Sequence, residues 1–311
     1  MNKDKLKKIL LIVITAFGVL IIASGSYAWN AFTSAITNIQ EEIDDQKTQK
    51  RLESINLEAG DPITILLMGI DEPDGEEDPY QRSDSLIFVT LNPHTESTHM
   101  VSIPRDTYTE IVGYGQKDKI NHSYAFGGTK MTINTVEEFL GIPVDYYVRV
   151  DMDGFEDIVN ALGGIEVEND FEFYYRKVTF EEGLLHLDGY EALQYIRMRK
   201  DDPRGDFGRQ ERQRQVIQAI VDKGTSIQGL TSSLSNFQGV LEIIEDNFRT
   251  NMSLQNMWDI QGNYRDALKN VVEHEIPGED GEMDETYYFM PDEEKVKELS
   301  EELNKQKQTV N

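Results

Sequence analysis

The feature that most constrains this chain is an uncharged, apolar stretch near its start. Ile9–Trp29 runs for 21 positions without a charged side chain. At 1.5 Å per residue, a helix of that length spans about 30 Å, the thickness of the hydrocarbon core of a bilayer. Tyr27 and Trp29 close the stretch, and aromatic side chains favour the membrane–water interface. The stretch therefore predicts one transmembrane helix and leaves the folded domain to the residues that follow.

Charge on the two flanks sets the orientation of this helix. Met1–Lys8 has four lysines against one acid, and the far flank is acidic from Glu41 to Asp45. The positive-inside rule predicts a cytoplasmic tail at residues 1–8 and a signal anchor at residues 9–29. The residues after Trp29 are then expected on the outer side of the cell membrane. A cleaved signal peptide is the alternative, but the run is long for one and no A-x-A site follows it. So short a tail leaves no room for a cytoplasmic kinase or DNA-binding domain.

The composition excludes several classes of site and partner. The chain of 311 residues contains no cysteine, which rules out disulfides, thiolate metal sites and a cysteine nucleophile. Its net charge of −27 argues against nucleic acid as a partner, because phosphate backbones attract basic surfaces. The five histidines show no H-E-x-x-H or other spacing typical of a metal site.

Apolar runs and helix-like segments alternate along the middle of the chain. Residues 30–60 are polar and helix-compatible, and we interpret them as a stalk. Residues 61–290 are predicted to form one α/β domain with a mixed central sheet. Residues 291–311 are expected to be a charged C-terminal tail. The clearest predicted strands are Ile63–Ile70, Ser85–Leu91, Thr98–Ile103 and Tyr146–Val150, and the clearest predicted helices are Thr129–Leu140, Gly154–Leu162, Gly189–Ile196 and Gly208–Lys223.

Charged residues lie where the first three predicted strands begin or end. Asp71 follows the first strand, and Arg82 and Asp84 precede the second. Arg105 follows the third strand. If the three strands pair antiparallel in sequence order, these ends meet at one edge of the sheet. Two carboxylates, together with phosphate oxygens of a substrate and water, suit Mg²⁺ as ligands. Asp71 and Asp84 are therefore candidate metal ligands. The alternative is that each residue is an ordinary solvated loop charge.

A second charged segment is basic, which is unusual in so acidic a chain. Arg197–Arg214 holds six arginines and one lysine against four acids. Gly205 and Gly208 flank Asp206 at the predicted start of a helix, whose exposed N–H groups can hold a phosphate. On that helix Arg209 projects to the edge of the apolar face and so points toward the domain. Its guanidinium needs an anion there, either a ligand phosphate or a neighbouring carboxylate.

Eight ordered motifs, preceded by the anchor, resemble one known family. The motifs are Met68–Asp71 (MGID), Arg82–Asn92 (RSDSLIFVTLN), Ser102–Thr107 (SIPRDT), Lys119–Gly128 (KINHSYAFGG), Asp145–Asp153 (DYYVRVDMD), Leu162–Val167 (LGGIEV), His186–Ala192 (HLDGYEA) and Tyr195–Gln213 (YIRMRKDDPRGDFGRQERQ). Their order and spacing resemble the LytR–CpsA–Psr family. The resemblance is strong from about Asp61 to Lys223 and looser elsewhere.

The resemblance implies an α/β/α sandwich with a hydrophobic tunnel for a prenyl chain. It also implies a phosphotransferase that attaches a glycopolymer, such as wall teichoic acid or capsular polysaccharide, to peptidoglycan. The donor is then a polyprenyl-pyrophosphate-linked glycan, the acceptor a muramic acid hydroxyl, and the product a phosphodiester. The pyrophosphate carries its own driving force, which suits an extracellular domain on the membrane of a Gram-positive-type envelope, where ATP is scarce.

The resemblance also assigns roles to individual residues. Asp71 and Asp84 match acids associated with Mg²⁺, with Mn²⁺ as an alternative ion. The candidate catalytic residues are Arg105, which matches the arginine of the S-I-P-R-D motif, and Asp71, which is our candidate to take the proton of the sugar hydroxyl. The candidate pyrophosphate-binding residues are Arg82, Arg105, Lys119, Arg197, Arg199, Arg204, Asp206, Arg209 and Arg212.

Two other functions remain open from the sequence alone. A polyprenyl-pyrophosphate hydrolase would use the same ion and arginines, with water in place of the sugar hydroxyl. A non-catalytic module would bind the envelope polymer or regulate the envelope without turnover. Formation of a covalent peptidoglycan adduct distinguishes the transferase from both.

Overall fold

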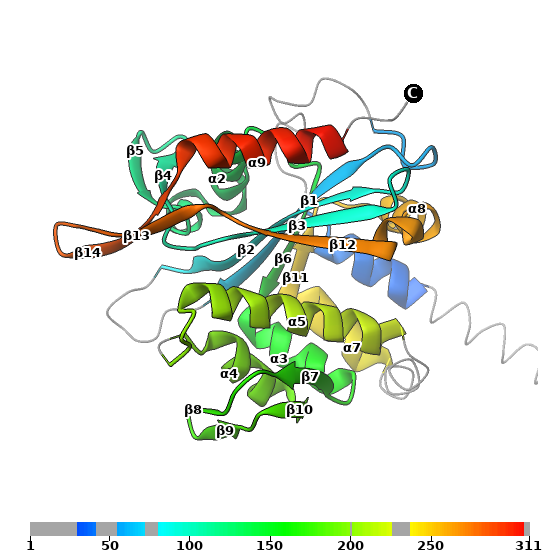
Figure 1. Cartoon of the computed structure of the whole chain (residues 1–311). Helices are drawn as coiled ribbons and strands as arrows, with labels where there is room; N and C mark the ends of the chain where they lie inside the picture. The colour runs from blue at the N-terminus through cyan, green and yellow to red at the C-terminus, as the bar shows by residue number, and fades with distance from the viewer. Residues whose placement is uncertain (1–29, 42–54, 72–79, 200, 226–236, 308–311) are drawn as a thin grey trace, which may run out of the picture.

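A six-stranded mixed sheet forms the centre of the domain. The computed structural model describes residues 30–41, 55–71, 80–199, 201–225 and 237–307. The strands of the sheet are β1 (Ile63–Asp71), β2 (Arg82–Asn92), β3 (Ser97–Ile103), β6 (Tyr146–Asp151), β11 (Phe248–Thr250) and β12 (Asn270–Glu275). Their order across the sheet is β11-β6-β1-β2-β3-β12 (Figure 1). β2 is antiparallel to β1 and β3, whereas β6 runs parallel to β1 and β12 parallel to β3.

Helices cover both faces of this sheet, as Figure 1 shows. The helices are α2 (His122–Leu140), α3 (Met152–Ala161), α4 (Gly189–Arg197), α5 (Asp206–Thr225), α7 (Phe237–Asn247), α8 (Leu254–Asn263) and α9 (Glu293–Gln306). Strand residues alternate between the two faces. In β2, Leu86 and Phe88 join the core under α2 and α9, while Ile87 and Val89 join a core on the opposite face. The prediction of a mixed α/β fold with a mixed central sheet is therefore confirmed.

A third apolar core lies outside the sheet, among α3, α4 and α5. Two short antiparallel ribbons close it, namely β7 (Ile165–Asn169) with β10 (Gly183–Leu187), and β8 (Phe173–Tyr175) with β9 (Val178–Phe180). Phe173 and Phe180 stack at a centroid distance of 4.7 Å, and both rings lie near Tyr195 of α4. These residues hold the ribbons against the helices.

The domain has two further antiparallel ribbons. They are β4 (Tyr108–Ile111) with β5 (Gln116–Lys119), and β13 (Gly278–Met283) with β14 (Thr286–Pro291). The strands β4, β5 and β13 are short and largely polar, so they lack the apolar alternation by which a half-buried strand is recognised. The exception is β14, whose aromatic run Tyr287–Met290 is predicted as a strand from the sequence. β13 carries the acidic side chains Glu279, Asp280 and Glu282.

The domain includes segments that we expected to lie outside it. Within the predicted C-terminal tail, α9 buries Val296, Leu299 and Leu303 in the core between this helix and the sheet. These residues recur at helical spacing among charged neighbours, which hides the apolar face in the composition. Within the predicted stalk, residues 30–39 are helical and bury Ala35, Ile36 and others against the domain.

The predicted membrane anchor lies beyond the part of the chain that the structure describes. Residues 1–8 and 9–29, the expected cytoplasmic tail and transmembrane segment, both fall outside the described ranges. Within those ranges no helix has the length and apolar character needed to cross a bilayer.

Candidate active site

A cleft of about 530 Å³ opens at the edge of the sheet where β1 ends, β2 begins and β3 ends. It is lined by eight of the residues that the sequence singled out: Asp71, Arg82, Asp84, Arg105, Lys119, Arg197, Arg199 and Arg209. Arg204 and Arg212 are not among its lining residues. Asp206 begins α5, and its side chain lies outside the described part of the structure.

A β-bulge shapes this edge of the sheet. Gly69 of β1 pairs with Ser85 of β2, and the next residue, Ile70, pairs with Ser83. The register therefore skips Asp84, which is the extra residue of the bulge. Bulges re-aim side chains and increase strand twist, and they recur beside active sites. Here the bulge places Asp84 in the cleft together with Asp71, the last residue of β1.

Each of these two aspartates is held by a basic side chain. Arg197 Nη2 lies 2.5 Å from Asp71 Oδ1 and joins the end of α4 to the end of β1. Arg105 Nη1 donates to Asp84 Oδ2, and Asn121 Nδ2 donates to Asp84 Oδ1 at 3.1 Å. The charge-assisted hydrogen bonds fix both carboxylates at the edge of the sheet.

A third carboxylate, Asp106, holds several of the cations together. Lys119 Nζ lies 2.8 Å from Asp106 Oδ1, and Arg199 Nη1 lies 3.3 Å from Asp106 Oδ2. Arg105 Nε is 3.7 Å from Oδ2. Burial raises the pKa of Asp106, but the hydrogen bond from Lys119 and the nearby positive charges outweigh it, so the pKa lies below its ordinary value. Asp106 is thus ionised and ties together cations from three separate segments.

Positive charge dominates the cleft. Its lining includes seven basic side chains against three carboxylates, although the whole chain carries a net charge of −27. Arg209 is 6% exposed and lines the cleft from α5, which agrees with its predicted inward orientation. Arg176 lines the cleft from the turn between β8 and β9, where its backbone φ is +42°. Lys177, the other residue of this two-residue turn, has a φ of +73°, and a positive φ at both positions is what a type I′ hairpin turn requires. The cleft is suited to a polyanionic ligand.

Arg212 has a different environment from the arginines of the cleft. Its side chain is 3% exposed, and its guanidinium bonds Asp202 and the backbone oxygens of Tyr195 and Met198. Burial raises the pKa of Asp202, but hydrogen bonds from Arg204 and Arg212 outweigh it and lower the pKa.

A Cβ at Gly208 would lie 1.9 Å from Asp202 Oδ2, so only glycine lets α5 begin this close to the carboxylate. Arg212 and Asp202 order the segment that presents Arg199.

We expect Arg212→Met to destabilise the domain, because it leaves Asp202 buried without its main counter-charge. Breaking a buried pair on one side costs about 3 kcal/mol or more, which lowers Tm by about 6–12 °C in a domain of this size. Calorimetry of the double variant Asp202→Asn/Arg212→Met is the control, because removing both charges should recover part of the loss. Equal Tm losses in the single and double variants would contradict a buried charge pair.

Several cleft residues were not selected from the sequence. Asp106, Asn121 and His122 all line the cleft. A signal for each was present, because Asp106 follows Arg105 in the S-I-P-R-D motif and the other two lie in the K-I-N-H motif. Tyr175 and Arg176 also line it, but they come from a ribbon that the sequence did not predict.

An apolar cavity of about 370 Å³ lies next to the cleft, between the sheet and the helices α3 and α5. Its lining is almost entirely aliphatic and aromatic: Leu67, Met68, Gly69, Ser85, Ile87, Val148, Val150, Met152, Phe155, Ile158, Ile196, Gln213, Ile217, Ile220 and Phe248. Met152, Ile196 and Gln213 line both the cavity and the cleft. A strongly cationic space therefore borders an apolar one.

Comparison with known proteins identifies the family to which this fold and cleft belong. The chain belongs to the LytR_cpsA_psr family, which matches residues 26–305. It is 47% identical over 305 residues to the polyisoprenyl-teichoic acid–peptidoglycan teichoic acid transferase TagU of Bacillus licheniformis, and the match covers 97% of each chain.

Solved structures agree with this assignment. The crystal structure of TagU from Bacillus subtilis is similar with a TM-score of 0.63 at 47% identity, covering 81% of this chain and 99% of that one. A structure of TagT bound to LIIa-WTA has a TM-score of 0.68 at 34% identity, covering 84% of this chain and 96% of that one.

Proposed function

We propose that this protein is a phosphotransferase that moves a teichoic acid from a polyprenyl-pyrophosphate carrier to peptidoglycan and joins them by a phosphodiester bond. The observation that carries the proposal is the contact between the cationic cleft and the apolar cavity through Met152, Ile196 and Gln213. A lipid pyrophosphate has the same two parts, an anionic head and an apolar chain. The names of the TagU relatives and of TagT bound to LIIa-WTA support teichoic acid as the polymer.

In this proposal the cleft binds the pyrophosphate and the cavity is the tunnel for the prenyl chain. Arginine forks match phosphate oxygens in two-point hydrogen bonds, so Arg105, Arg197, Arg199 and Arg209 are the main candidates to hold the two phosphates. Arg82 and Lys119 add positive charge at the same edge. Arg204 forms ion pairs with Asp202 and Glu211 and does not line the cleft, and Arg212 has an ordering role. The apolar lining of the cavity would keep water away from the prenyl chain.

The reaction forms one P–O bond and breaks another. The hydroxyl oxygen of the acceptor attacks the phosphorus on the polymer side of the pyrophosphate, and the bond to polyprenyl phosphate breaks. The hydroxyl proton goes to a base, for which Asp71 is our candidate. Arg105 stabilises the charge that develops on the transferred phosphate oxygens. Positioning and charge stabilisation supply most of the acceleration in phosphoryl transfer.

Mg²⁺ fits this cleft as the proposed cofactor. Asp71 and Asp84 supply two carboxylates in one cleft, and Mg²⁺ in phosphoryl-transfer sites is bound through one or two carboxylates plus substrate phosphates and water. When bound, the ion would offset charge on the pyrophosphate oxygens. Arg105 and Asn121 hold the Asp84 carboxylate in place, and Arg197 holds that of Asp71. Mn²⁺ prefers the same oxygen ligands and is the alternative ion.

The proposed location is the outer face of the cell membrane of a Gram-positive-type envelope. Residues 9–29 would cross the bilayer once, with residues 1–8 in the cytoplasm and the domain outside. A prenyl-linked donor lies in the same membrane, so the anchor would keep the cleft near its substrate.

The deciding experiment uses the purified full chain in detergent with a synthetic polyprenyl-pyrophosphate glycan, Mg²⁺ and peptidoglycan oligomers. Mass spectrometry should find a phosphodiester-linked adduct that is absent when a chelator is added and returns with Mg²⁺. Free sugar phosphate without an adduct would favour the hydrolase. Donor that binds but is recovered intact would favour a non-catalytic binding module.

Filling the apolar cavity should weaken use of the lipid donor. Ile217 lines the cavity from α5, and Ile217→Trp would occupy space that the prenyl chain needs. Loss of the burial of a few CH₂ groups, at about 0.8 kcal/mol each, predicts a rise of roughly 10–100-fold in KM for a long-chain donor. A short-chain donor analogue should be used almost as well as by the wild type. Leu184→Trp is the control, because Leu184 is exposed and outside the cavity; equal effects of the two variants would contradict the tunnel.

A further inference from the structure

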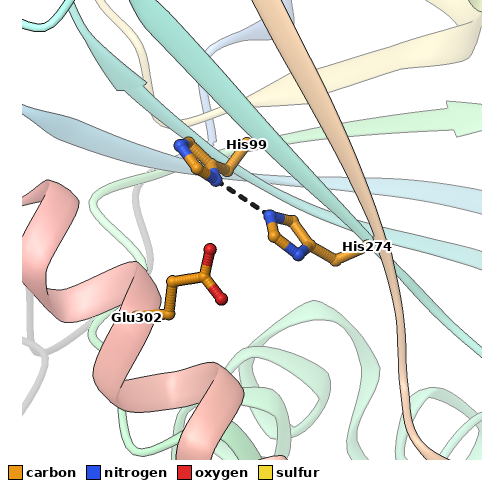
Figure 2. Close-up of side chains that lie close together, drawn as sticks. All are labelled: His99, His274 and Glu302. Carbon is orange, nitrogen blue, oxygen red and sulfur yellow. Dashed lines mark hydrogen bonds between the residues drawn. The ribbon is translucent and has the colours of Figure 1, made fainter.

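A pair of histidines lies on the α9 side of the sheet, and neither residue lines the cleft. His99 of β3 and His274 of β12 are 175 positions apart, and His99 Nδ1 lies 2.8 Å from His274 Nε2. Their rings stack with centroids 5.1 Å apart and planes 13° apart. Figure 2 shows the carboxylate of Glu302, from α9, next to both rings. One ligand atom from each of the three residues lies within 4.8 Å of the others.

The strand register explains how these residues meet. His99 pairs with Val272, and His274 pairs with Val101, so the two histidines are diagonal neighbours on one face of the parallel pair. That face also carries Val101 into the core under α9. Sequence spacing could not indicate the cluster, because its members come from two strands and a helix. Motif scanning detects ligands that lie close in sequence, and it found no such spacing here.

The chemistry of the cluster is that of a metal site. Neutral imidazole and carboxylate are ligands for Zn²⁺, and two histidines with one glutamate leave a fourth position for water. His99 is 5% exposed. Burial lowers the pKa of His99 and His274 lowers it further, while Glu302 raises it. The net shift is downward, so His99 is neutral near pH 7, which is the form that binds metal.

A second observation concerns Thr90, which pairs with His99 across β2 and β3. Residues directly opposite in an antiparallel pair have their side chains on the same face, close together. Thr90 is 2% exposed, and its hydroxyl has no hydrogen-bond partner among the described residues. A buried polar group without a partner is costly, and a bound water beside it would relieve that cost. A metal-bound water is one such group.

We propose that His99, His274 and Glu302 form a zinc site that joins the C-terminal helix to the edge of the sheet. In a tetrahedral site each nitrogen lies about 2.0–2.1 Å from zinc, which puts the two nitrogens roughly 3.3 Å apart. Their separation of 2.8 Å therefore has to increase by roughly half an ångström. Zn²⁺ would displace the proton that now lies between Nδ1 of His99 and Nε2 of His274, and the ring that loses it would take up a proton at its other nitrogen, so both imidazoles bind the ion in their neutral form.

The expected consequence is structural. The ligands come from β3, from the edge strand β12 and from α9, so one ion would connect three segments far apart in the chain. Zinc bound only by the folded state stabilises it by mass action. At a hundredfold excess over Kd, we expect Tm to rise by about 5–10 °C.

The test is zinc binding to the full chain, without an affinity tag, after chelator treatment and in detergent. Competition with a chromophoric chelator, in excess Mg²⁺ to occupy the acids of the cleft, should give one Zn²⁺ per chain. Glu302→Gln and His274→Gln should each weaken binding at least tenfold and abolish the rise in Tm. His186→Gln is the matched control, because His186 is an exposed histidine 3.0 Å from Glu166 in the β7–β10 ribbon.

Cobalt provides an independent readout, since Co²⁺ in a site with nitrogen and oxygen ligands should give visible bands that disappear in Glu302→Gln. Glu302 is exposed, so this variant should fold even if His274→Gln does not. The proposal is overturned if the wild type binds no stoichiometric zinc, or if Glu302→Gln binds it as tightly as the wild type does.

Discussion

Replacing Arg105 with alanine should reduce transfer by about a thousandfold without unfolding the domain. Arg105 donates to Asp84 and its Nε lies near Asp106, so its guanidinium is fixed between two acids that line the cleft. Removal of one positioned donor or arginine from a phosphoryl-transfer site costs about 10²–10⁵ in rate. The side chain is 29% exposed, and a partly exposed pair contributes only about 0–1 kcal/mol to stability. We therefore expect a Tm within a few degrees of the wild type.

Two matched variants sharpen this test. Arg105→Lys keeps the charge but loses the planar fork, so its transfer rate should fall between those of the wild type and Arg105→Ala. Arg265→Ala removes an exposed arginine whose Nε donates to the backbone oxygen of Gln261, and it should transfer at the wild-type rate. Transfer retained in Arg105→Ala, or loss of its thermal transition, would contradict the assigned role.

The centre of the sheet could be predicted because β1 and β2 are long and apolar. β1 and β2 carry runs that are apolar on both faces, and the Asn92-Pro93 turn leads directly into β3. Antiparallel pairing of these three strands then implied that their charged ends meet, and the structure brings Asp71, Asp84 and Arg105 to one cleft. The strands β8 and β9 have three residues each, too few to show a strand period, so the position of Arg176 in the turn between them could not be predicted.

The basic helix shows where sequence periodicity is insufficient. A helical wheel assumes one buried face and one solvated face. α5 lies between the sheet and the third core, and it buries Arg209, Arg212 and Arg214 in different directions. Arg209 faces the cleft, Arg212 binds Asp202, and Arg214 Nε lies 2.6 Å from Glu273. The resemblance grouped Arg209 and Arg212 in one motif, but only tertiary packing decides which of them meets a ligand.

Asp106→Asn should both destabilise the domain and impair transfer. The substitution removes the carboxylate that holds Lys119 and Arg199 in place, and that carboxylate is 7% exposed. Removing one partner from buried ion pairs costs about 3 kcal/mol, which corresponds to a fall of about 6–12 °C in Tm near pH 7. Transfer should fall as well, because the two cations lose the group that orients them toward the cleft.

The pH dependence of unfolding distinguishes this charge effect from a packing defect. The folded-state pKa of Asp106 is lower than its ordinary value of 3.8, so its stabilisation is complete well above pH 3.8 and is lost as the pH falls through the folded-state pKa. The difference in Tm between wild type and Asp106→Asn should therefore be largest near pH 7 and shrink in the acid range. Asp266→Asn, at a carboxylate that is 61% exposed beside Lys269, should show a much smaller difference throughout. A difference for Asp106→Asn that stays constant down to the lowest pH at which the protein is folded would mean that the carboxylate's charge does not hold the cleft together.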